Sequence, residues 1–196
     1  MDELPVTVAI TGASGAPYGV RLLAALNGAH VPVGLIVSGT GWRLLQEEMD
    51  IADEAVLRRH TGDWSRVVMY RDEDRGATPA SGSAPSRGMV VCPCSMGTLA
   101  SIAQGTTRSL IERAADVVLK ERRRLILVPR ETPYSQIHLE NMLRLTRAGA
   151  LILPASPGFY HRPAGIADLI DFVVGRVLAH LDVRTDIGPR WQSGES

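Results

Sequence analysis

A cation and a carboxylate stand side by side directly after a short apolar run in this chain. Arg130 and Glu131 follow Leu125–Val128 with one proline between. Four consecutive apolar residues are typical of a strand buried on both faces of a parallel sheet. Ligands of open α/β sheets bind beyond the carboxyl ends of the strands. The pair could therefore hold an anion and move a proton, although the sequence is equally compatible with a surface ion pair on a loop.

Three other turns with small and hydroxyl-bearing residues follow apolar runs. They are Thr11-Gly-Ala-Ser-Gly15, Val37-Ser38-Gly39 and Ser95-Met-Gly-Thr98. Such turns expose backbone N–H groups at a helix start and can bind a phosphate or the edge of a flavin, although a tight turn or helix capping explains each one separately. Their spacing matches neither G-x-G-x-x-G nor a Walker loop, which argues against ATP. Together the turns favour flavin mononucleotide (FMN), which has one phosphate, and no acidic ribose-binding residue follows the first turn.

The last third of the chain adds a Tyr, a His and an Arg. Tyr160 and His161 close Pro157-Gly-Phe-Tyr-His161, which follows the last apolar run and should lie at the ligand edge of the sheet. His161 by itself is more often a loop histidine than a catalyst. Arg176 lies among four apolar residues of the final helix, and a cation embedded in this way requires an anionic partner, internal or bound.

The sequence contains no pattern that is typical of a metal site or of a redox-active cysteine pair. Cys92 and Cys94 have one residue between them, which is the wrong spacing for a Cys-x-x-Cys pair, and no His pair lies nearby to complete a zinc site. We expect two buried thiols at a strand end. The Asp-Asp-x-x-Asp pattern of magnesium-bound diphosphate enzymes does not occur.

Composition narrows the class of protein further. The 21 Lys and Arg residues balance 21 Asp and Glu residues, so no basic field favours nucleic acid or a membrane surface. No apolar run is long enough to span a bilayer, and the first residues lack the pattern of a signal peptide, so we expect a cytoplasmic protein. The length predicts a single domain over residues 1–182. Residues 183–196 are expected to form a C-terminal arm, anchored at Pro189-Arg-Trp191, which could contact another protomer.

Strands and helices are predicted to alternate along the chain. This pattern indicates an α/β fold with a doubly wound, Rossmann- or flavodoxin-like parallel sheet and helices on both faces. The segment 71–88 is the weakest for regular structure. The helix Ser109–Arg122 carries an apolar stripe and begins with a capping-box pattern, Ser109 and Glu112. The predicted strands are 6–10, 33–37, 89–92, 125–128 and 150–153, and the predicted helices are 17–26, 42–49, 53–60, 98–103, 109–122, 135–146 and 166–181.

With these residues assembled, the chain resembles the UbiX-type flavin prenyltransferases over nearly its whole length. The most specific matching stretches begin at Glu112, Pro129, His138 and Pro154 and read Glu112-Arg-Ala-Ala-Asp-Val-Val-Leu-Lys-Glu-Arg122, Pro129-Arg-Glu-Thr-Pro133, His138-Leu-Glu-Asn-Met142 and Pro154-Ala-Ser-Pro-Gly-Phe-Tyr-His-Arg-Pro163. Four blocks in the right order make a chance match very improbable.

The resemblance implies a metal-independent transfer of a dimethylallyl group from dimethylallyl monophosphate to N5 and C6 of reduced FMN. The product would serve a UbiD-type decarboxylase, and the enzyme would be a homo-oligomer, typically a dodecamer, with sites between subunits. Catalytic roles are implied for Ser14, Glu48, Lys120 and Glu131, with Glu131 relaying a proton through Ser14. Donor binding is implied for Lys120, Arg130, Tyr160 and Arg176, of which Tyr160 and Arg176 could reach across from a neighbour. FMN binding is implied for Gly12, Ala13, Ser14, Ser38, Ser95, Met96, Gly97, Thr98 and Arg130.

One departure and two alternatives accompany the resemblance. Ala84 stands where the family usually has an aromatic residue, and Arg75-Gly-Ala77 replaces a more apolar run, which leaves the shape of the prenyl pocket open. An FMN-dependent decarboxylase of the same superfamily would share the fold, but its Asn-containing Pro-x-Met-Asn segment is replaced by Pro93-Cys-Ser-Met96. A flavin carrier without chemistry of its own would leave Lys120 and Glu131 without a role.

Overall fold

The protein is built around one parallel sheet. A computed structural model describes residues 4–188. The sheet has six strands in the order β3-β2-β1-β4-β5-β6, with every pairing parallel. The strands are β1 (Val6–Ile10), β2 (Val33–Val37), β3 (Val67–Arg71), β4 (Gly88–Cys94), β5 (Arg124–Pro129) and β6 (Leu151–Ile152). The predicted doubly wound sheet is confirmed, and its strand order is of the Rossmann type, which reverses direction between β1 and β4.

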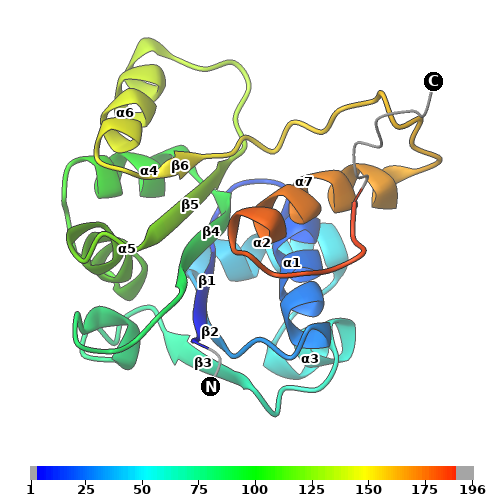
Figure 1. The fold of residues 1–196 in the computed structure, drawn as a ribbon, viewed down its shortest axis with the longest axis horizontal. Coiled ribbons are helices and arrows are strands. Elements are labelled where there is room, and N and C mark those ends of the chain that lie inside the picture. The colour runs from blue at the N-terminus through cyan, green and yellow to red at the C-terminus, as the bar shows by residue number, and fades with distance from the viewer. Residues whose placement is uncertain (1–3, 189–196) are drawn as a thin grey trace.

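Helices cover both faces of the sheet (Figure 1). On one face α1 packs against α2, α3 and α7, and on the other α4 packs against α5 and α6. Most helix ends agree with the sequence prediction within about two residues. The helices are α1 (Ala16–Gly28), α2 (Gly39–Met49), α3 (Glu54–Thr61), α4 (Met96–Ala103), α5 (Leu110–Lys120), α6 (Gln136–Arg147) and α7 (Ile166–His180), with a short 3₁₀ turn η1 (Thr78–Ala80).

Two hydrophobic cores lie on the two faces, and the strands contribute to both. In β1, Val8 and Ile10 face the core under α1 and α7, whereas Ala9 faces the core under α4 and α5. In β5, residues 125–128 are completely buried, as the apolar run predicted. Since alternate side chains of a strand point to opposite faces, only an unbroken apolar run can satisfy both cores.

The structure differs from the predicted elements in three places. The edge strand β3 was not predicted, because it is paired on one side only and its burial is mixed. Helix α2 begins at Gly39 rather than Trp42, which makes Ser38 its N-cap. At α5 the capping box is only half formed, since Ser109 accepts from Glu112 N but the Glu112 carboxylate accepts from Arg108 N at 2.7 Å.

The C-terminal part of the described chain turns back along α7. Val183 is buried, and Ile187 and Gly188 lie against Gly175 of α7. The proposed anchor Pro189-Arg-Trp191 lies outside the described residues, and the division into a domain and an arm at residue 183 stays a prediction. None of the helices within residues 4–188 combines the length and the apolar character needed to cross a membrane.

Candidate functional site

The carboxyl ends of β1, β2 and β4 are joined by hydrogen bonds at the point where the strand order reverses. Thr11 Oγ1 donates to the carbonyl of Pro93 at 2.9 Å and accepts from the N–H of Ser95 at 2.9 Å. The N–H of Ser38 donates to the carbonyl of Ile10 at 3.0 Å. These bonds bring the three predicted turns together at the carboxyl ends of the strands, which is where open α/β sheets bind ligands.

The turn before α2 presents hydroxyl and backbone N–H groups. Ser38 Oγ accepts from Gly41 N at 3.0 Å and lies 3.2 Å from Thr40 Oγ1. Gly39 is exposed, and a Cβ atom there would have nothing within 4 Å, so space is open beside its backbone. Sequence reasoning named Ser38 and missed Thr40, although Ser38-Gly-Thr-Gly41 repeats the small-residue pattern of the other turns.

The first turn and the turn before α2 are in direct contact. A Cβ at Gly12 would lie 2.4 Å from Thr40 Oγ1, so only glycine fits there without displacing Thr40. Ala13 is buried at 4% exposure and offers a ligand little beyond its backbone. Ser14 is exposed at the tip of the turn.

The turn before α4 is a well-formed helix cap. Ser95 Oγ accepts from Thr98 N at 3.2 Å and lies 3.0 Å from Thr98 Oγ1. Gly97 is exposed, whereas the side chain of Met96 packs into the core under α4 and α5. A ligand here would meet the backbone of residues 96 and 97 and the hydroxyls of the two flanking residues.

Glu48 occupies the N-terminus of α1. Its Oε2 atom accepts from Gly15 N at 2.9 Å and from Ala16 N at 2.8 Å. The sequence predicted these N–H groups as a site for a phosphate or the edge of a flavin; in this structure a carboxylate from α2 accepts from them. Resemblance placed Glu48 near the site, but no local pattern indicated this contact.

Arg130 connects the end of β5 to the first turn. Its Nε donates to the carbonyl of Ser14 at 3.0 Å, and its terminal nitrogens make no hydrogen bond within residues 4–188. Glu131 accepts from Thr132 N at 3.1 Å. Among the described residues these two side chains do not pair with one another, so the alternative of a surface ion pair is not realised.

Tyr160 belongs to a cluster of three rings. His161 stacks on Phe172 of α7, with centroids 5.4 Å apart, and Tyr160 meets both rings edge-on at 5.7 and 5.8 Å. Both ring nitrogens of His161 are buried and have no hydrogen-bond partner in the described part of the chain. Phe172, which sequence reasoning did not single out, holds the loop carrying Tyr160 against α7.

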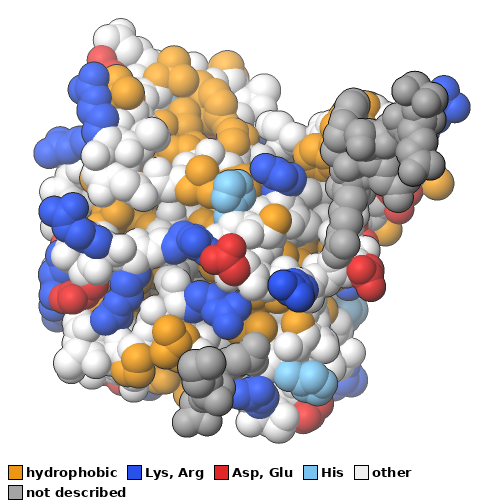
Figure 2. Space-filling model, viewed as in Figure 1, with side chains coloured by type: hydrophobic (Ala, Val, Ile, Leu, Met, Phe, Trp, Pro, Cys, Tyr) orange, Lys and Arg blue, Asp and Glu red, His pale blue; other side chains and the backbone are white. Residues whose placement is uncertain are grey.

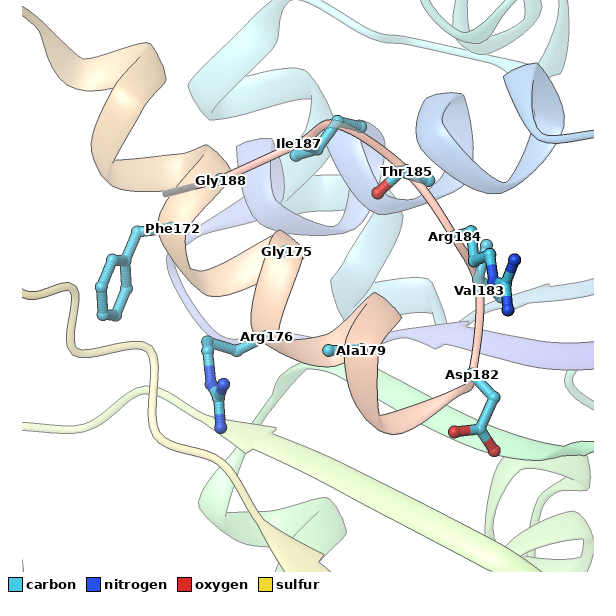
Figure 3. A pocket seen from close by; sticks show the side chains of 10 residues that line it. All are labelled: Phe172, Gly175, Arg176, Ala179, Asp182, Val183, Arg184, Thr185, Ile187 and Gly188. Atoms are coloured by element: carbon cyan, nitrogen blue, oxygen red, sulfur yellow. The ribbon is translucent and has the colours of Figure 1, made fainter. Parts of the chain in front are cut away.

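Arg176 lies one helical turn after Phe172, and its side chain is exposed. Figure 3 shows it leaving α7 at the edge of a cavity of about 650 Å³ between the helix and residues 182–188. The expectation of an embedded cation is wrong, because the neighbouring apolar residues face the core and Arg176 falls on the outer side of the helix. Within residues 4–188 it makes no ion pair or hydrogen bond, which leaves it available to an anion.

Lys120 lies at the amino ends of the strands, opposite the carboxyl ends that carry the three turns. It ends α5 directly before β5, whereas Arg130 follows the same strand, and a strand of this length spans about 20 Å. Lys120 pairs with Glu121 and lies beside Gly82. A single chain therefore does not bring Lys120 to the turns that carry Ser14 and Arg130.

Ala84, which departs from the family pattern, also lies near the amino ends of the strands. It lines a cavity of about 240 Å³ together with Tyr70 and Pro79, and its carbonyl accepts from Arg123 at 2.7 Å. In one chain, the departure from the family pattern therefore lies away from the three turns.

The two cysteines are buried, as expected. Burial raises the pKa of the Cys92 thiol to about 12 and also raises that of Cys94 above its ordinary value. Both thiols are therefore protonated near neutral pH. Within the part of the chain that the structure describes, no three His, Cys, Asp or Glu residues are grouped to hold a metal ion.

The donors at the carboxyl edge fit a phosphorylated planar molecule. The turns before α2 and α4 offer capped helix N-termini with exposed glycines, and Arg130 adds a cation with unused donors. A phosphate monoester could take the helix N-terminal groups while a flat ring lies along the turns. This donor set matches FMN.

Comparison with known proteins agrees with this chemistry. The model of a family described as Flavoprotein matches residues 1–178. The flavin prenyltransferase UbiX of Pseudomonas aeruginosa is 48% identical over 194 residues, which cover 95% of this chain and 93% of the relative.

Two solved structures have closely similar folds. AnUbiX (PadA1), in complex with FMN and dimethylallyl pyrophosphate, is 44% identical with a TM-score of 0.91, covering 98% of this chain and 100% of that one. A dodecameric FMN-dependent UbiX-like decarboxylase from Escherichia coli O157:H7 is 40% identical with a TM-score of 0.89, covering 97% and 100%.

Proposed function

Because the chain belongs to the Flavoprotein family and, within it, to the UbiX-type flavin prenyltransferases, we propose that it transfers a dimethylallyl group to reduced FMN. The donor is dimethylallyl monophosphate, and the reaction needs no metal. The contact between Arg130 and Ser14 carries this proposal, because it places a cation with free donors beside a hydroxyl-bearing turn at the ligand edge of the sheet.

FMN is held by the three turns and by Arg130. The phosphate takes the N-terminus of α2, where the Ser38 hydroxyl and the exposed backbone at Gly39 offer hydrogen-bond donors. The ring system lies along Gly12 to Ser14 and the backbone of residues 95–98. The N-terminus of α1 takes no part in phosphate binding, since Glu48 fills it.

The donor phosphate is bound by cations and by a tyrosine. Breaking an allylic C–O bond leaves a phosphate dianion, and fixed cations such as Arg130 and Arg176 stabilise that departing charge. Tyr160 adds a phenolic donor, and the ring cluster with His161 and Phe172 keeps its ring in place. The bound reduced flavin supplies two nucleophilic positions, N5 and C6, for the two new bonds.

Glu131 and Ser14 move the proton that the reaction releases. The Glu131 carboxylate follows β5, one residue after the arginine that contacts Ser14. A carboxylate and a hydroxyl at this edge can pass a proton from the flavin toward the leaving phosphate.

Lys120 contributes to the site from a neighbouring subunit. In one chain it lies at the opposite edge of the sheet, so it can meet the donor phosphate only if a second copy presents that edge to the site. Exposed apolar side chains on and beside α6, namely Tyr134, Ile137, Leu139 and Leu143, provide surface for such contacts. Figure 2 shows hydrophobic side chains gathered beside α6. A dodecamer, as in the E. coli structure, would satisfy this requirement.

The product serves a second enzyme. Prenylated FMN is a cofactor rather than an end product, so we propose a UbiD-type decarboxylase as its recipient. A cytoplasmic location, where reduced FMN is available, stays a prediction of the sequence.

The test is anaerobic incubation of the purified protein with reduced FMN and dimethylallyl monophosphate, followed by mass spectrometry of the extracted flavin. A flavin heavier by one C5H8 unit is expected, and its absence would contradict the proposal. Dimethylallyl diphosphate is tested in parallel to establish the donor. Incubation without a donor is the control.

A decarboxylase is the second candidate, because the similar E. coli protein is an FMN-dependent UbiX-like decarboxylase. Release of carbon dioxide from an added acid by the FMN-bound protein, without prenylation, would favour it. Tight FMN binding without either reaction would indicate a carrier.

A further inference from the structure

An ion pair joins the first and the last helix of the fold. Arg21 of α1 donates from Nε to Oδ1 of Asp171 on α7 at 2.6 Å, and from Nη2 to Oδ2 at 3.1 Å. Two parallel hydrogen bonds of this kind fix both the distance and the direction between a guanidinium and a carboxylate. The two residues are 150 positions apart in the sequence, and neither belongs to the site described above.

Helix α1 is the fixed side of this contact. A Cβ atom at Gly19 would lie 2.5 Å from the carbonyl oxygen of Cys92, so the helix lies directly on β4. Its N-cap is Gly15, the last residue of the first turn, which carries Ser14. A group that is fixed to α1 is therefore also fixed relative to the ligand edge of the sheet.

Helix α7 depends on α1 for its position. The chain forms no helix or strand in residues 153–165 before α7 or in residues 181–188 after it, and the most extensive helix contact of α7 is with α1. Val173, Val174 and Val177 are buried in the core. Because apolar contacts are not directional, packed helices can still slide slightly against one another. The ion pair adds the directional contact that apolar packing lacks.

The side chains that α7 brings to the site come directly after Asp171. Phe172 is the next residue, and Arg176 follows it by one helical turn. With 3.6 residues per turn, these two share one side of α7 (Figure 3), whereas Asp171 points about 140° away from Arg176. The Phe172 ring also meets the Tyr160 ring, at 5.8 Å. A rotation of α7 would therefore move Arg176 and Tyr160 together.

We propose that Arg21 and Asp171 are positioning residues for the donor phosphate. Their ion pair sets the rotation of α7 and so holds Arg176 and Tyr160 in a fixed place relative to the first turn, along which the flavin ring lies. This inference rests on the proposed function, in which Arg176 and Tyr160 bind the donor. Since the pair acts through α7 and touches no ligand, its loss should weaken donor binding and leave FMN binding unchanged.

The experiment measures the KM for dimethylallyl monophosphate and the dissociation constant of FMN in Arg21→Met and Asp171→Asn. Both substitutions keep most of the side-chain volume and remove one charge of the pair. The KM should rise about three- to thirtyfold, as is typical for coupled residues, while the affinity for FMN stays the same. Arg21→Lys, which keeps the cation, should recover part of the loss. Arg58→Ala breaks the pair with Glu54 on α3, also 2.6 Å long, and should leave the KM unchanged.

A double-mutant cycle with Arg176→Ala separates positioning from stability. If the pair acts through Arg176, Arg21→Met should raise the KM by a smaller factor when Arg176 is already absent. A pair that only stabilised the fold would lower the unfolding temperature and the yield of active protein, without raising the KM of the protein that remains active. If Arg21→Met does not fold, Asp171→Asn and Arg21→Lys decide. An unchanged KM in the folded variants would overturn the inference, as would the same factor in the Arg176→Ala background.

Failure of this inference is separable from failure of the proposed function. A wild type that prenylates FMN but shows no change of KM on substitution loses the positioning role alone. If the wild type yields no prenylated flavin, the proposed function fails, and the dissociation constant of inorganic phosphate from the FMN-bound protein is compared instead. A rise of that constant in Arg21→Met and Asp171→Asn supports the positioning role, and no rise overturns it.

Discussion

Arg130 donates from Nε to the carbonyl oxygen of Ser14 at 3.0 Å, across 116 positions of the sequence. The bond fixes the guanidinium by its inner nitrogen, and within residues 4–188 neither terminal nitrogen makes a hydrogen bond. An arginine held in this way presents a planar pair of donors, which suits a phosphate. The end of β5 and the first turn are thereby held in a fixed relation at the ligand edge of the sheet.

Arg130→Lys should weaken FMN binding although it keeps the charge. Lysine has no Nε–H at this position and no fork, and a hydrogen bond to a charged group contributes about 1.5–3 kcal/mol. The dissociation constant of FMN should rise about 10- to 100-fold, as measured by flavin fluorescence quenching. Arg59→Lys, on the exposed side of α3, is the matched control. Equal affinity in Arg130→Lys and the wild type would contradict the role of the contact.

Glu131→Gln should bind FMN normally and turn over slowly. The amide can still accept from Thr132 N through its oxygen, but it cannot take up a proton. The loss of a positioned proton acceptor lowers rates by about 10²- to 10⁴-fold. Single-turnover formation of the prenylated flavin measures the rate, and fluorescence titration measures binding. Unchanged turnover would remove Glu131 from the mechanism.

Arg176→Ala should raise the KM for the allylic phosphate while the affinity for FMN stays the same. The side chain is exposed, makes no ion pair or hydrogen bond within residues 4–188 and leaves α7 one turn after Phe172 (Figure 3). Phe172 belongs to the ring cluster that includes Tyr160. Arg176→Lys should recover part of the loss because it keeps a cation. Equal loss of affinity for both ligands would indicate a structural role instead.

Lys120→Ala and Glu131→Gln should each turn over very slowly alone and should recover activity when their subunits are mixed. If each site takes Lys120 from one subunit and Glu131 from another, random mixing in equal amounts leaves about a quarter of the sites intact. The measurement is product formation after the two variants are dissociated and reassembled together. If both residues acted within one chain, no mixed oligomer would contain an intact site and activity would not return.

The buried thiols should make the fold less stable in alkali. The pKa of Cys92 in the folded protein, about 12, is above the value of an exposed thiol. The unfolded chain therefore releases the proton first, and the free energy of unfolding falls as pH rises above the unfolded pKa, by about 1.4 kcal/mol per pH unit for each such thiol. Urea unfolding of the wild type and of Cys92→Ala at pH 7 and pH 10 measures this. A wild type with no steeper decline than the variant would contradict it.

The sequence by itself determined the sheet and the position of its ligand edge. Residues 125–128 form an unbroken apolar run because both faces of β5 are buried, and that requirement is visible residue by residue. The small-residue turns at Ser38 and Ser95 cap the helices that follow, through contacts only three residues apart. Because these features depend on residues close together in the sequence, they could be predicted without the structure.

Only the tertiary structure decided which side chains meet at that edge. The contact of Glu48 with the N-terminus of α1 depends on how two helices pack, and the outward direction of Arg176 depends on the rotation of α7 about its axis. Each of these depends on contacts between residues far apart in the chain, which the local order of residue types does not encode.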